Sequence, residues 1–366
     1  MPMTQDLLPR LAAPAVACAL AATVTSGVVS PVSASTPTQP RAALAAAAQR
    51  GATDINVASF NIQSAGHDRT AGLQRPWRHR RATVVRQILS NRTDVVGVQE
   101  AAYTPSFVRR LVSGRTQYHD LRNGLNRQGG RYAVTANAAV NCVRAYVAHN
   151  CRGRDRNASA AERIIYNKRT LAVVRTGSLR YSRQTARTPN MYLAWAVLRS
   201  RATGARFLFT TTHLDPSSRA VRRSQWRQMI RTVRRVRNGL PVVSVGDFNT
   251  NKIDPMARTM LPAMRGAGFG DVLNQQYRVN PTRNVRARTR VNGWLNTYNH
   301  LTRRVATFGY EDRRGNTGNG IDWIFASNHL AVLEYEVVCD FHPRTLRVQG
   351  TMPSDHNMIR ARLRLP

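Results

Sequence analysis

The segment Pro241–Asn249 reads PVVSVGDFN, and it decides the fold that the sequence predicts. Its first half is a short apolar run, typical of a strand buried on both faces. Its second half places Asp247 and Asn249 directly after that strand. Asp and Asn are ordinary turn formers, so this pattern alone does not indicate a functional site. It becomes informative because the same arrangement recurs along the chain.

Polar side chains stand beside other predicted strands in the same way. They are Asn61, Glu100, His213, Asp322, Asp355 and His356. The whole chain holds only 19 acidic residues, and four of them, counting Asp247, lie next to apolar strands. Solvation does not explain this placement, so these side chains are the candidate functional residues.

Apolar periodicity predicts a strand-rich chain with few helices. Strands are expected at 55–60, 94–98, 163–166, 171–175, 192–198, 206–212, 241–245, 321–326, 331–338 and 358–365. Helices are expected at 77–89, 218–236 and 255–264, the second of them long and basic. This mixture predicts an α/β (α+β) fold of two packed, mostly antiparallel sheets flanked by helices in a four-layer sandwich. The segments Gly114–Asn157 and Gln275–Thr317 are expected to be long irregular loops.

The first 34 residues have the features of an export signal. Arg10 closes a short n-region, Leu11–Val29 is apolar, and Val32–Ala34 supplies small residues for cleavage. Proline and glycine interrupt the apolar stretch, which argues against a permanent membrane anchor. A lipoprotein signal around Cys18 fits the usual pattern poorly. The protein is therefore expected to be secreted to the extracellular medium.

The mature chain is expected to hold one folded unit. Residues 35–53 are rich in Ala, Pro, Ser and Thr and predict a linker, while residues 54–366 are expected to form one domain, the catalytic domain if the candidate residues are functional. Cys142 and Cys151 enclose a short polar segment, and we expect an exported protein to join them in a disulfide. Cys339 has apolar neighbours and is expected to be a buried thiol.

The charge of the chain is strongly positive. Against its 19 acidic residues it has 55 basic ones, which gives a formal net charge of +36, and Lys168 and Lys252 are the only lysines. Genomic bias would replace lysine by arginine, but it does not explain why acids are scarce. Such a chain attracts nucleic acid or an anionic lipid surface. Nothing in the sequence indicates a protein partner, and a monomer is expected.

Together the candidate residues supply the groups that phosphodiester cleavage needs. Carboxylate and amide oxygens suit Mg²⁺, with Mn²⁺ or Ca²⁺ as alternatives. A histidine held by a carboxylate deprotonates water near neutral pH. A second histidine or an asparagine stabilises the negative oxygens of the transition state. No cysteine cluster or paired histidine spacing points to zinc.

The ordered set of motifs resembles the endonuclease/exonuclease/phosphatase superfamily over about Ile55–Leu365. The matching motifs are Ser-Phe-Asn61, Gln-Glu100, Thr-His213-Leu, Gly-Asp247-Phe-Asn249, Ile-Asp322-Trp-Ile and Ser-Asp355-His356. The resemblance implies that Glu100 is the main metal ligand, aided by Asn61 and Asp355. It also implies that His356 is the general base and that Asp322 orients it.

The resemblance assigns further roles. Asp247 and Asn249 would position the nucleophilic water and the phosphate, and His213 would donate to the phosphate or act as general acid. Tyr166 matches a place where many members put an aromatic near the site; a half-buried strand aromatic is the alternative interpretation.

Departures from subfamily patterns narrow the expected function. Gly320 precedes Ile321 where apurinic-type enzymes usually have arginine. The form Thr-His213-Leu is closer to the deoxyribonuclease, sphingomyelinase and phosphatase branches. The long loops are polar and basic, which favours a secreted nonspecific nuclease. A lipid phosphodiesterase or inositol phosphate phosphatase is the alternative, and a non-catalytic polyanion-binding protein is a further one.

Overall fold

The computed structural model describes residues 52–67, 75–103, 116–136, 159–186, 190–252, 254–273, 290–305 and 320–366. The predicted signal peptide, nearly all of the predicted linker and the Cys142–Cys151 pair lie outside these residues, so those three expectations stay predictions.

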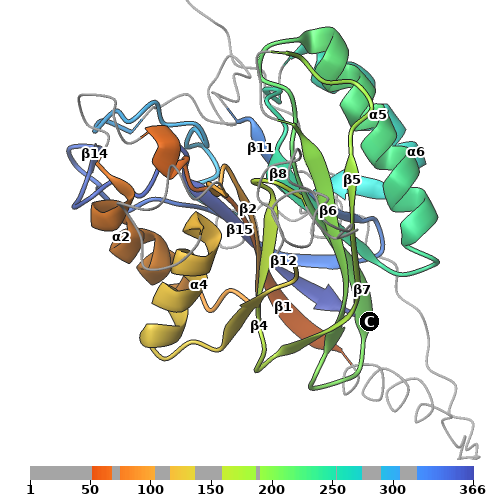
Figure 1. Ribbon diagram of the computed structural model, residues 1–366, viewed down its shortest axis with the longest axis horizontal. Helices are drawn as coiled ribbons and strands as arrows, with labels where there is room; N and C mark the ends of the chain where they lie inside the picture. Colours follow the sequence, from red (N-terminus) through yellow and green to blue (C-terminus); the bar gives the residue numbers. More distant parts are fainter. Residues whose placement is uncertain are drawn as a thin grey trace, which may run out of the picture. The chain divides into compact units, whose positions relative to one another are not determined.

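Two β-sheets form the centre of the described domain (Figure 1). The seven-stranded sheet has the order β10-β12-β15-β1-β2-β4-β3. Its strands are β1 (Thr53–Asn61), β2 (Val95–Gln99), β3 (Tyr132–Val134), β4 (Arg163–Asn167), β10 (Arg290–Val291), β12 (Ala331–Val338) and β15 (Met358–Leu365). The six-stranded sheet has the order β5-β6-β7-β8-β11-β9. Its strands are β5 (Leu171–Arg180), β6 (Tyr192–Ser200), β7 (Arg206–His213), β8 (Val242–Asp247), β9 (Phe269–Asp271) and β11 (Asp322–Ser327).

Most strand pairs are antiparallel, as predicted. Among the described strands the parallel pairs are β1–β2, β7–β8 and β10–β12. A separate ribbon pairs β13 (Phe341–His342) with β14 (Arg347–Val348). Each strand predicted from apolar periodicity is present, which confirms that part of the prediction.

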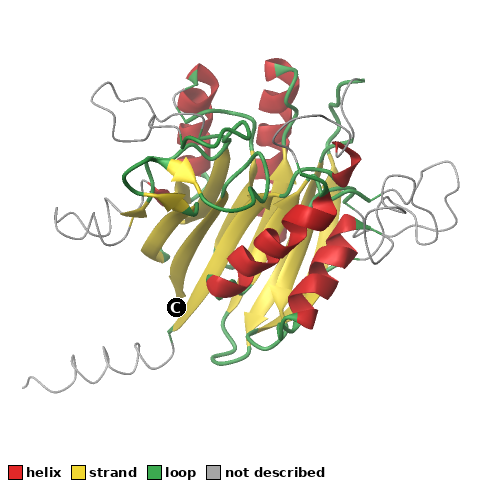
Figure 2. Cartoon of the chain, turned by 90° about the vertical axis from the view of Figure 1, so that its left-hand side faces the viewer, coloured by secondary structure: helices red, strands yellow, loops and turns green. Residues whose placement is uncertain are grey.

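Helices cover the outer face of each sheet. The helices α2 (Trp77–Ser90) and α4 (Gln117–Arg127) pack against the seven-stranded sheet, while α5 (Arg219–Val236) and α6 (Pro255–Gly266) pack against the other. Figures 1 and 2 show the two pairs of helices on opposite sides of the strands. A short 3₁₀ turn, η1 (Ala65–His67), follows β1. The predicted four-layer sandwich is therefore confirmed.

The helix α4 corrects the prediction that residues 114–157 form one irregular loop. Its composition is polar, but Tyr118, Leu121 and Leu125 recur at helical spacing and are fully buried. The Thr116 side chain caps its first turn by accepting from the His119 N–H. In the second predicted loop, residues 290–291 form β10.

The two sheets approach each other closely at Gly97 of β2. A Cβ atom there would lie 2.5 Å from Thr211 Oγ1 and 2.6 Å from Val245 Cγ2, both on the facing sheet. Because the core between the sheets is fully packed, a methyl group at this position has no space. Gly97 thus sets the spacing of the strands that carry the candidate residues.

Replacing Gly97 with alanine is expected to lower the free energy of unfolding by about 1–3 kcal/mol, because the inserted methyl overpacks the core. Urea denaturation followed by circular dichroism measures this. The matched control is Gly266→Ala in α6, where a Cβ would meet nothing within 4 Å. There we expect no loss, and a gain of up to about 1 kcal/mol. Equal stabilities for the two variants would contradict the prediction.

Cys339 is a free thiol that is partly buried, where the sequence predicted a buried one. It packs against the core between the sheets, and burial, followed by the nearby Asp340 carboxylate, raises its pKa to about 12. The thiol is therefore protonated at neutral pH and unreactive. None of the helices that the structure describes has the length and apolar character needed to cross a membrane.

Candidate active site

The candidate residues meet at one edge of the sandwich because of strand direction. Strands β1 and β2 run parallel and end at Asn61 and Gln99, which are register partners. In the other sheet, His213 ends β7 and Asp322 begins β11, and both are register partners of Asp247 at the end of β8. Asn61 Nδ2 lies 3.2 Å from Asp247 Oδ2, so the two sheets meet through these side chains.

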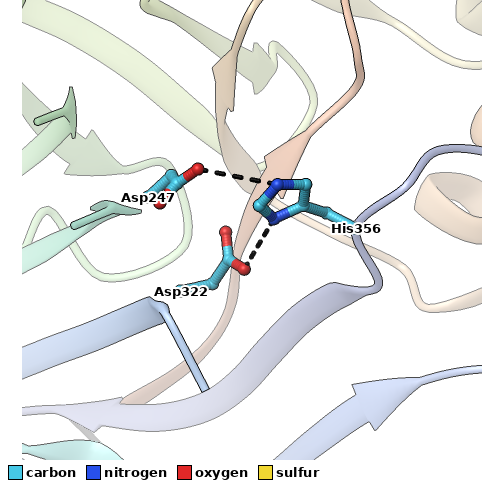
Figure 3. Close-up of side chains that lie close together, drawn as sticks. All are labelled: Asp247, Asp322 and His356. Carbon is cyan, nitrogen blue, oxygen red and sulfur yellow. Dashed lines mark hydrogen bonds and ion pairs between the residues drawn. The ribbon is translucent and has the colours of Figure 1, made fainter. Parts of the chain in front are cut away.

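His356 and Asp322 form a buried pair (Figure 3). The His356 Nδ1 atom lies 2.8 Å from Asp322 Oδ2, and His356 is 3% exposed. On its other side, His356 Nε2 lies 3.6 Å from Asp247 Oδ2. The ring of Tyr298 packs against the imidazole with 4.9 Å between ring centroids. A carboxylate on Nδ1 fixes the tautomer that leaves Nε2 free to accept a proton.

The surrounding carboxylates make His356 strongly basic. Burial opposes the charged imidazolium, but Asp322, Asp247 and Asp355 outweigh it and raise the pKa of His356 to about 10. A cation bound to those carboxylates would offset their charge and return this pKa towards neutrality. The predicted role of His356 as the base fits this arrangement.

Glu100 and Asp355 form an oxygen-rich group beside Asn61. Asn61 Nδ2 donates to Glu100 Oε1 at 3.0 Å, and the Ser64 N–H donates to Glu100 Oε2 at 3.2 Å. Burial raises the pKa of Asp355; the nearby His356 opposes that shift and the Glu100 carboxylate adds to it. Two neighbouring carboxylates that disfavour each other's charge are suited to a divalent cation.

Asn61 lies at the predicted place, although its amide nitrogen faces the carboxylates. Its oxygen Oδ1 accepts from the Gln63 N–H at 3.0 Å. In this arrangement Asn61 orients Glu100 by donating to it. A role as metal ligand would require the amide oxygen to face the cation instead.

A second group of potential ligands lies next to the first. Asp247, Asp322 and His356 place ligand atoms within 4.8 Å of one another. Asp322 Oδ1 is buried and has no hydrogen-bond partner among the described residues. The donor set of the whole site is therefore carboxylate oxygen and imidazole, which fits a divalent metal without identifying it.

His213 and Asn249 complete the site on the side of the six-stranded sheet. Asn249 Nδ2 lies 2.9 Å from His213 Nε2 and donates to the Leu214 carbonyl at 2.8 Å. His213 Nε2 also lies 3.4 Å from Asp247 Oδ2. Burial raises the pKa of Asp247, and His213 and His356 oppose that shift. Asp247 is thus held between two imidazoles.

Two of the site residues have left-handed backbone conformations. Glu100, directly after β2, has φ +56°, and Asn249, two residues after β8, has φ +46°. Such conformations are unfavourable for residues other than glycine and persist where neighbouring structure holds them. Here they turn the side chains back over the ends of the strands.

Tyr166 corrects the expectation of an aromatic at the site. It lies opposite Val95, at the start of β2, and packs against the core between the sheets. Because β4 runs antiparallel to β2, its first residue and not its last lies at the site edge. The alternative interpretation, a half-buried strand aromatic, is correct.

Glu162, the residue just before β4, is an acid near the site that sequence reasoning missed. Glu162 is 1% exposed, and burial raises its pKa well above the usual range; Arg163 opposes this shift, and Glu100 adds to it. An acid beside a buried strand is the same signal that singled out Glu100. Glu162 therefore adds a further buried acid near Glu100.

Arg80 holds the two loops that carry the site. Its guanidinium is buried and donates to the carbonyls of Ile62, Gln63 and Pro353 at 2.5, 2.7 and 3.0 Å. These carbonyls follow β1 on one side and precede Asp355 on the other. Arg80 therefore joins the loop after Asn61 to the loop before His356.

Replacing Arg80 with methionine is expected to lower the free energy of unfolding by about 2 kcal/mol or more, since the buried Ile62 and Pro353 carbonyls would lose their donor at a cost of about 1–3 kcal/mol each. The Gln63 carbonyl would still accept from Gln117 Nε2 at 3.0 Å. Urea denaturation measures the loss. Arg86→Met is the control, because Arg86 lies exposed on the same helix and should change stability by no more than about 0.5 kcal/mol. A loss no larger in Arg80→Met than in the control would disprove the anchoring role.

The fold and the site define a class of protein. Two packed sheets present carboxylates, an asparagine and a buried His–Asp pair at one edge. Residues 58–356 match the Endonuclease/Exonuclease/phosphatase family. The chain belongs to that family, which confirms the resemblance seen in the motifs.

Individual relatives are more distant. The chain is 26% identical over 247 residues to Nocturnin of Drosophila melanogaster, a match that covers 63% of this chain and 35% of that protein. The chain therefore spans about a third of the length of this curated relative.

Solved structures share the fold at low identity. A mannosyl-6-phosphatase of Bacteroides thetaiotaomicron is 18% identical, with a TM-score of 0.59, and the match covers 84% of this chain and 99% of that one. TDP2 of D. rerio, complexed with a single-strand DNA product, is 15% identical with a TM-score of 0.52, over 85% of this chain and 99% of that one.

Proposed function

We propose that the chain is a secreted, divalent-metal-dependent nuclease that hydrolyses phosphodiester bonds with a water activated by His356. The observation that carries this proposal is the His356–Asp322 pair, 2.8 Å apart, placed beside the carboxylates of Glu100, Asp247 and Asp355. A base, an acid-rich cation site and neutral donors at one edge are what in-line attack of water on a phosphodiester requires.

Each residue has a defined task in this mechanism. His356 Nε2 accepts the proton of the attacking water while Asp322 holds Nδ1 and stabilises the imidazolium that forms. Asp247 and Asn249 orient the water and the phosphate, and His213 donates to a phosphate oxygen or to the leaving oxygen. A divalent cation held by Glu100 and Asp355, with Asn61 beside them, would polarise the phosphoryl group and offset charge on the leaving oxygen.

Three observations support nucleic acid as the substrate. The chain carries a formal net charge of +36, which attracts polyanions. TDP2 binds a single-strand DNA product on the same fold. Among the described residues Val174, 46% exposed, is the single large hydrophobic side chain on the surface, which does not favour insertion into a lipid membrane.

The test is cleavage of supercoiled plasmid by the purified mature chain with Mg²⁺, beside the same reaction in EDTA and an Asp247→Ala control. Nicking that depends on metal and is absent from the control is the expected result. No nicking with Mg²⁺, Mn²⁺ or Ca²⁺ would sink the nuclease proposal. Sphingomyelin vesicles, inositol phosphates and sugar phosphates would then be the substrates to assay.

The proposal of export rests on the first 34 residues and has its own test. Expression of the full chain in a secreting host should release a protein that lacks them, as N-terminal sequencing of the medium fraction would reveal. Mass spectrometry without reductant should find Cys142 linked to Cys151. Full-length protein retained in the cell would refute export.

A further inference from the structure

The exposed face of α5 consists almost entirely of arginine. Of the residues of this helix that are exposed, all but Ala220 are arginines: Arg219, Arg223, Arg227, Arg231, Arg234 and Arg235. We call these six residues the arginine face. Five of them recur every fourth residue, and at 1.5 Å per residue the face is about 24 Å long.

Acidic side chains do not neutralise this face. The helix α5 contains no acidic residue, and α6 beside it contains none either. Arg219 pairs with Asp254 at 3.2 Å, and it is the single member of the arginine face with an ion pair among the described residues. A solvated helix surface usually mixes charges of both signs, because like charges four residues apart repel. The arrangement therefore costs stability and calls for a functional reason.

The arginine face begins next to the active site. The helix α5 connects the end of β7, at His213, with the start of β8 at the opposite edge of the sheet. Asp215 receives the Ser217 and Ser218 N–H groups at 2.9 and 2.7 Å and so caps the entry to the helix. The buried Arg222 donates to the Asp215 carbonyl at 2.7 Å and interacts electrostatically with Asp247. The helix α5 thus leads from the site down one side of the six-stranded sheet (Figure 1), and the arginine face follows its course.

We propose that the arginine face is a binding surface for the phosphate backbone of a nucleic-acid strand whose scissile phosphate lies in the site. This inference rests on the proposed function and specifies its substrate: a long polyanion held well beyond the bond that is cut. At most about seven phosphates fit along the face, because even a strand of a double helix carries only one charge per about 3.4 Å of axis. Guanidinium groups bind phosphate through two parallel hydrogen bonds.

A lipid surface fits the same face less well. Helices that bind membranes lay an apolar face into the lipid. The apolar face of α5, which includes Trp226, Met229 and Val233, is buried against the sheet and α6. No aromatic or large aliphatic side chain accompanies the exposed arginines of this helix. Charge complementarity without apolar contact favours a nucleic acid.

The test is binding of a fluorescein-labelled 30-nucleotide single strand, measured by anisotropy in EDTA so that no cleavage occurs. The variant is Arg223→Gln/Arg227→Gln/Arg231→Gln. The control, Arg78→Gln/Arg86→Gln/Arg169→Gln, removes the same charge from exposed positions on α2 and after β4. We expect the first variant to weaken binding at least about tenfold near 0.1 M salt. The slope of log K against log salt should also fall by about 2, since each phosphate contact contributes about 0.7.

Other results would overturn the proposal. Equal losses in variant and control would mean that net charge alone attracts the strand. An unchanged affinity in the variant would show that the face is not used. If the variant binds the 30-nucleotide strand with unchanged affinity but no longer binds phosphatidylserine vesicles, the face would be assigned to a lipid surface. Binding is measured without turnover, so a failure of the parent protein to nick plasmid would not change the binding result. If the parent nicks plasmid and the variant binds the strand as tightly as the parent does, this inference fails and the proposed function does not.

Discussion

Replacing Glu100 with glutamine is expected to lower the rate of phosphodiester hydrolysis by about 10³-fold or more. Glutamine keeps the shape of the side chain and still offers an oxygen to Asn61 Nδ2, now 3.0 Å from Oε1. It removes the negative charge that, in the proposed function, holds a divalent cation together with Asp355. A catalytic metal contributes several kcal/mol to the stability of the transition state, and each 1.4 kcal/mol is worth about tenfold in rate.

Metal binding separates this explanation from damage to the fold. Titration calorimetry with Mn²⁺ should give a dissociation constant for Glu100→Gln at least about tenfold above that of the parent. Thermal denaturation should leave the two proteins similar in stability. The control is Glu336→Gln on β12, where Glu336 pairs with Arg360 away from the site; its activity should match the parent. A Glu100→Gln variant that binds metal and turns over normally would remove Glu100 from the role of main ligand.

Strand-end positions were the predictable part of the site. Apolar runs such as Val242–Asp247 mark buried strands because few other structures bury every residue of so short a segment. The polar residue that ends such a run must lie at the edge of a sheet. Asn61, Glu100, His213 and Asp247 were found by this reasoning, and the structure brings them together.

Pairings across the chain were not predictable from spacing. His356 and Asp322 are separated by 34 residues, and their contact depends on the opposite directions of β8 and β11 and on the loop before β15. The resemblance to the superfamily predicted that pair correctly. It also predicted that Tyr166 lies near the site, which is wrong. Strand direction explains the error, since the sequence of β4 does not reveal which of its ends reaches the site.

Buried charge was the other feature that sequence alone conceals. In a chain with 55 basic residues, nothing distinguishes the buried Arg80 from its exposed neighbours Arg78 and Arg86 before the loops that it joins are known. The helix α4 was missed for a related reason. Its buried stripe of Tyr118, Leu121 and Leu125 is narrow, and polar residues such as Gln117 and Asp120 are buried with it. The polar composition of this segment predicts a loop, and the helix becomes evident only from the side chains that it buries.

Replacing Asp322 with asparagine is expected to lower kcat by about 10³-fold or more, because the asparagine amide can donate to Nδ1 and favour the tautomer in which Nε2 carries the proton and cannot accept one. His356 must be neutral to accept a proton from water, so the rate rises as the pH passes its pKa. Asp322 is the largest of the influences that raise this pKa to about 10. Without that carboxylate the pKa falls, and the acidic limb of the pH–rate profile should move to lower pH even as the plateau drops.

The lower plateau and the shifted acidic limb together distinguish a role of Asp322 in setting the tautomer and pKa of His356 from a purely structural role. Loss of structure would lower the rate at every pH and leave the position of the acidic limb where it was. The profile of kcat against pH for the parent and for Asp322→Asn, measured at saturating Mg²⁺ on a labelled oligonucleotide, gives both quantities. Asp340→Asn, an exposed aspartate beyond β12, is the control and should reproduce the parent profile. An acidic limb at the same pH in Asp322→Asn would mean that His356 is not the base whose ionisation limits the rate, and His213, 3.4 Å from Asp247, would take its place as the candidate.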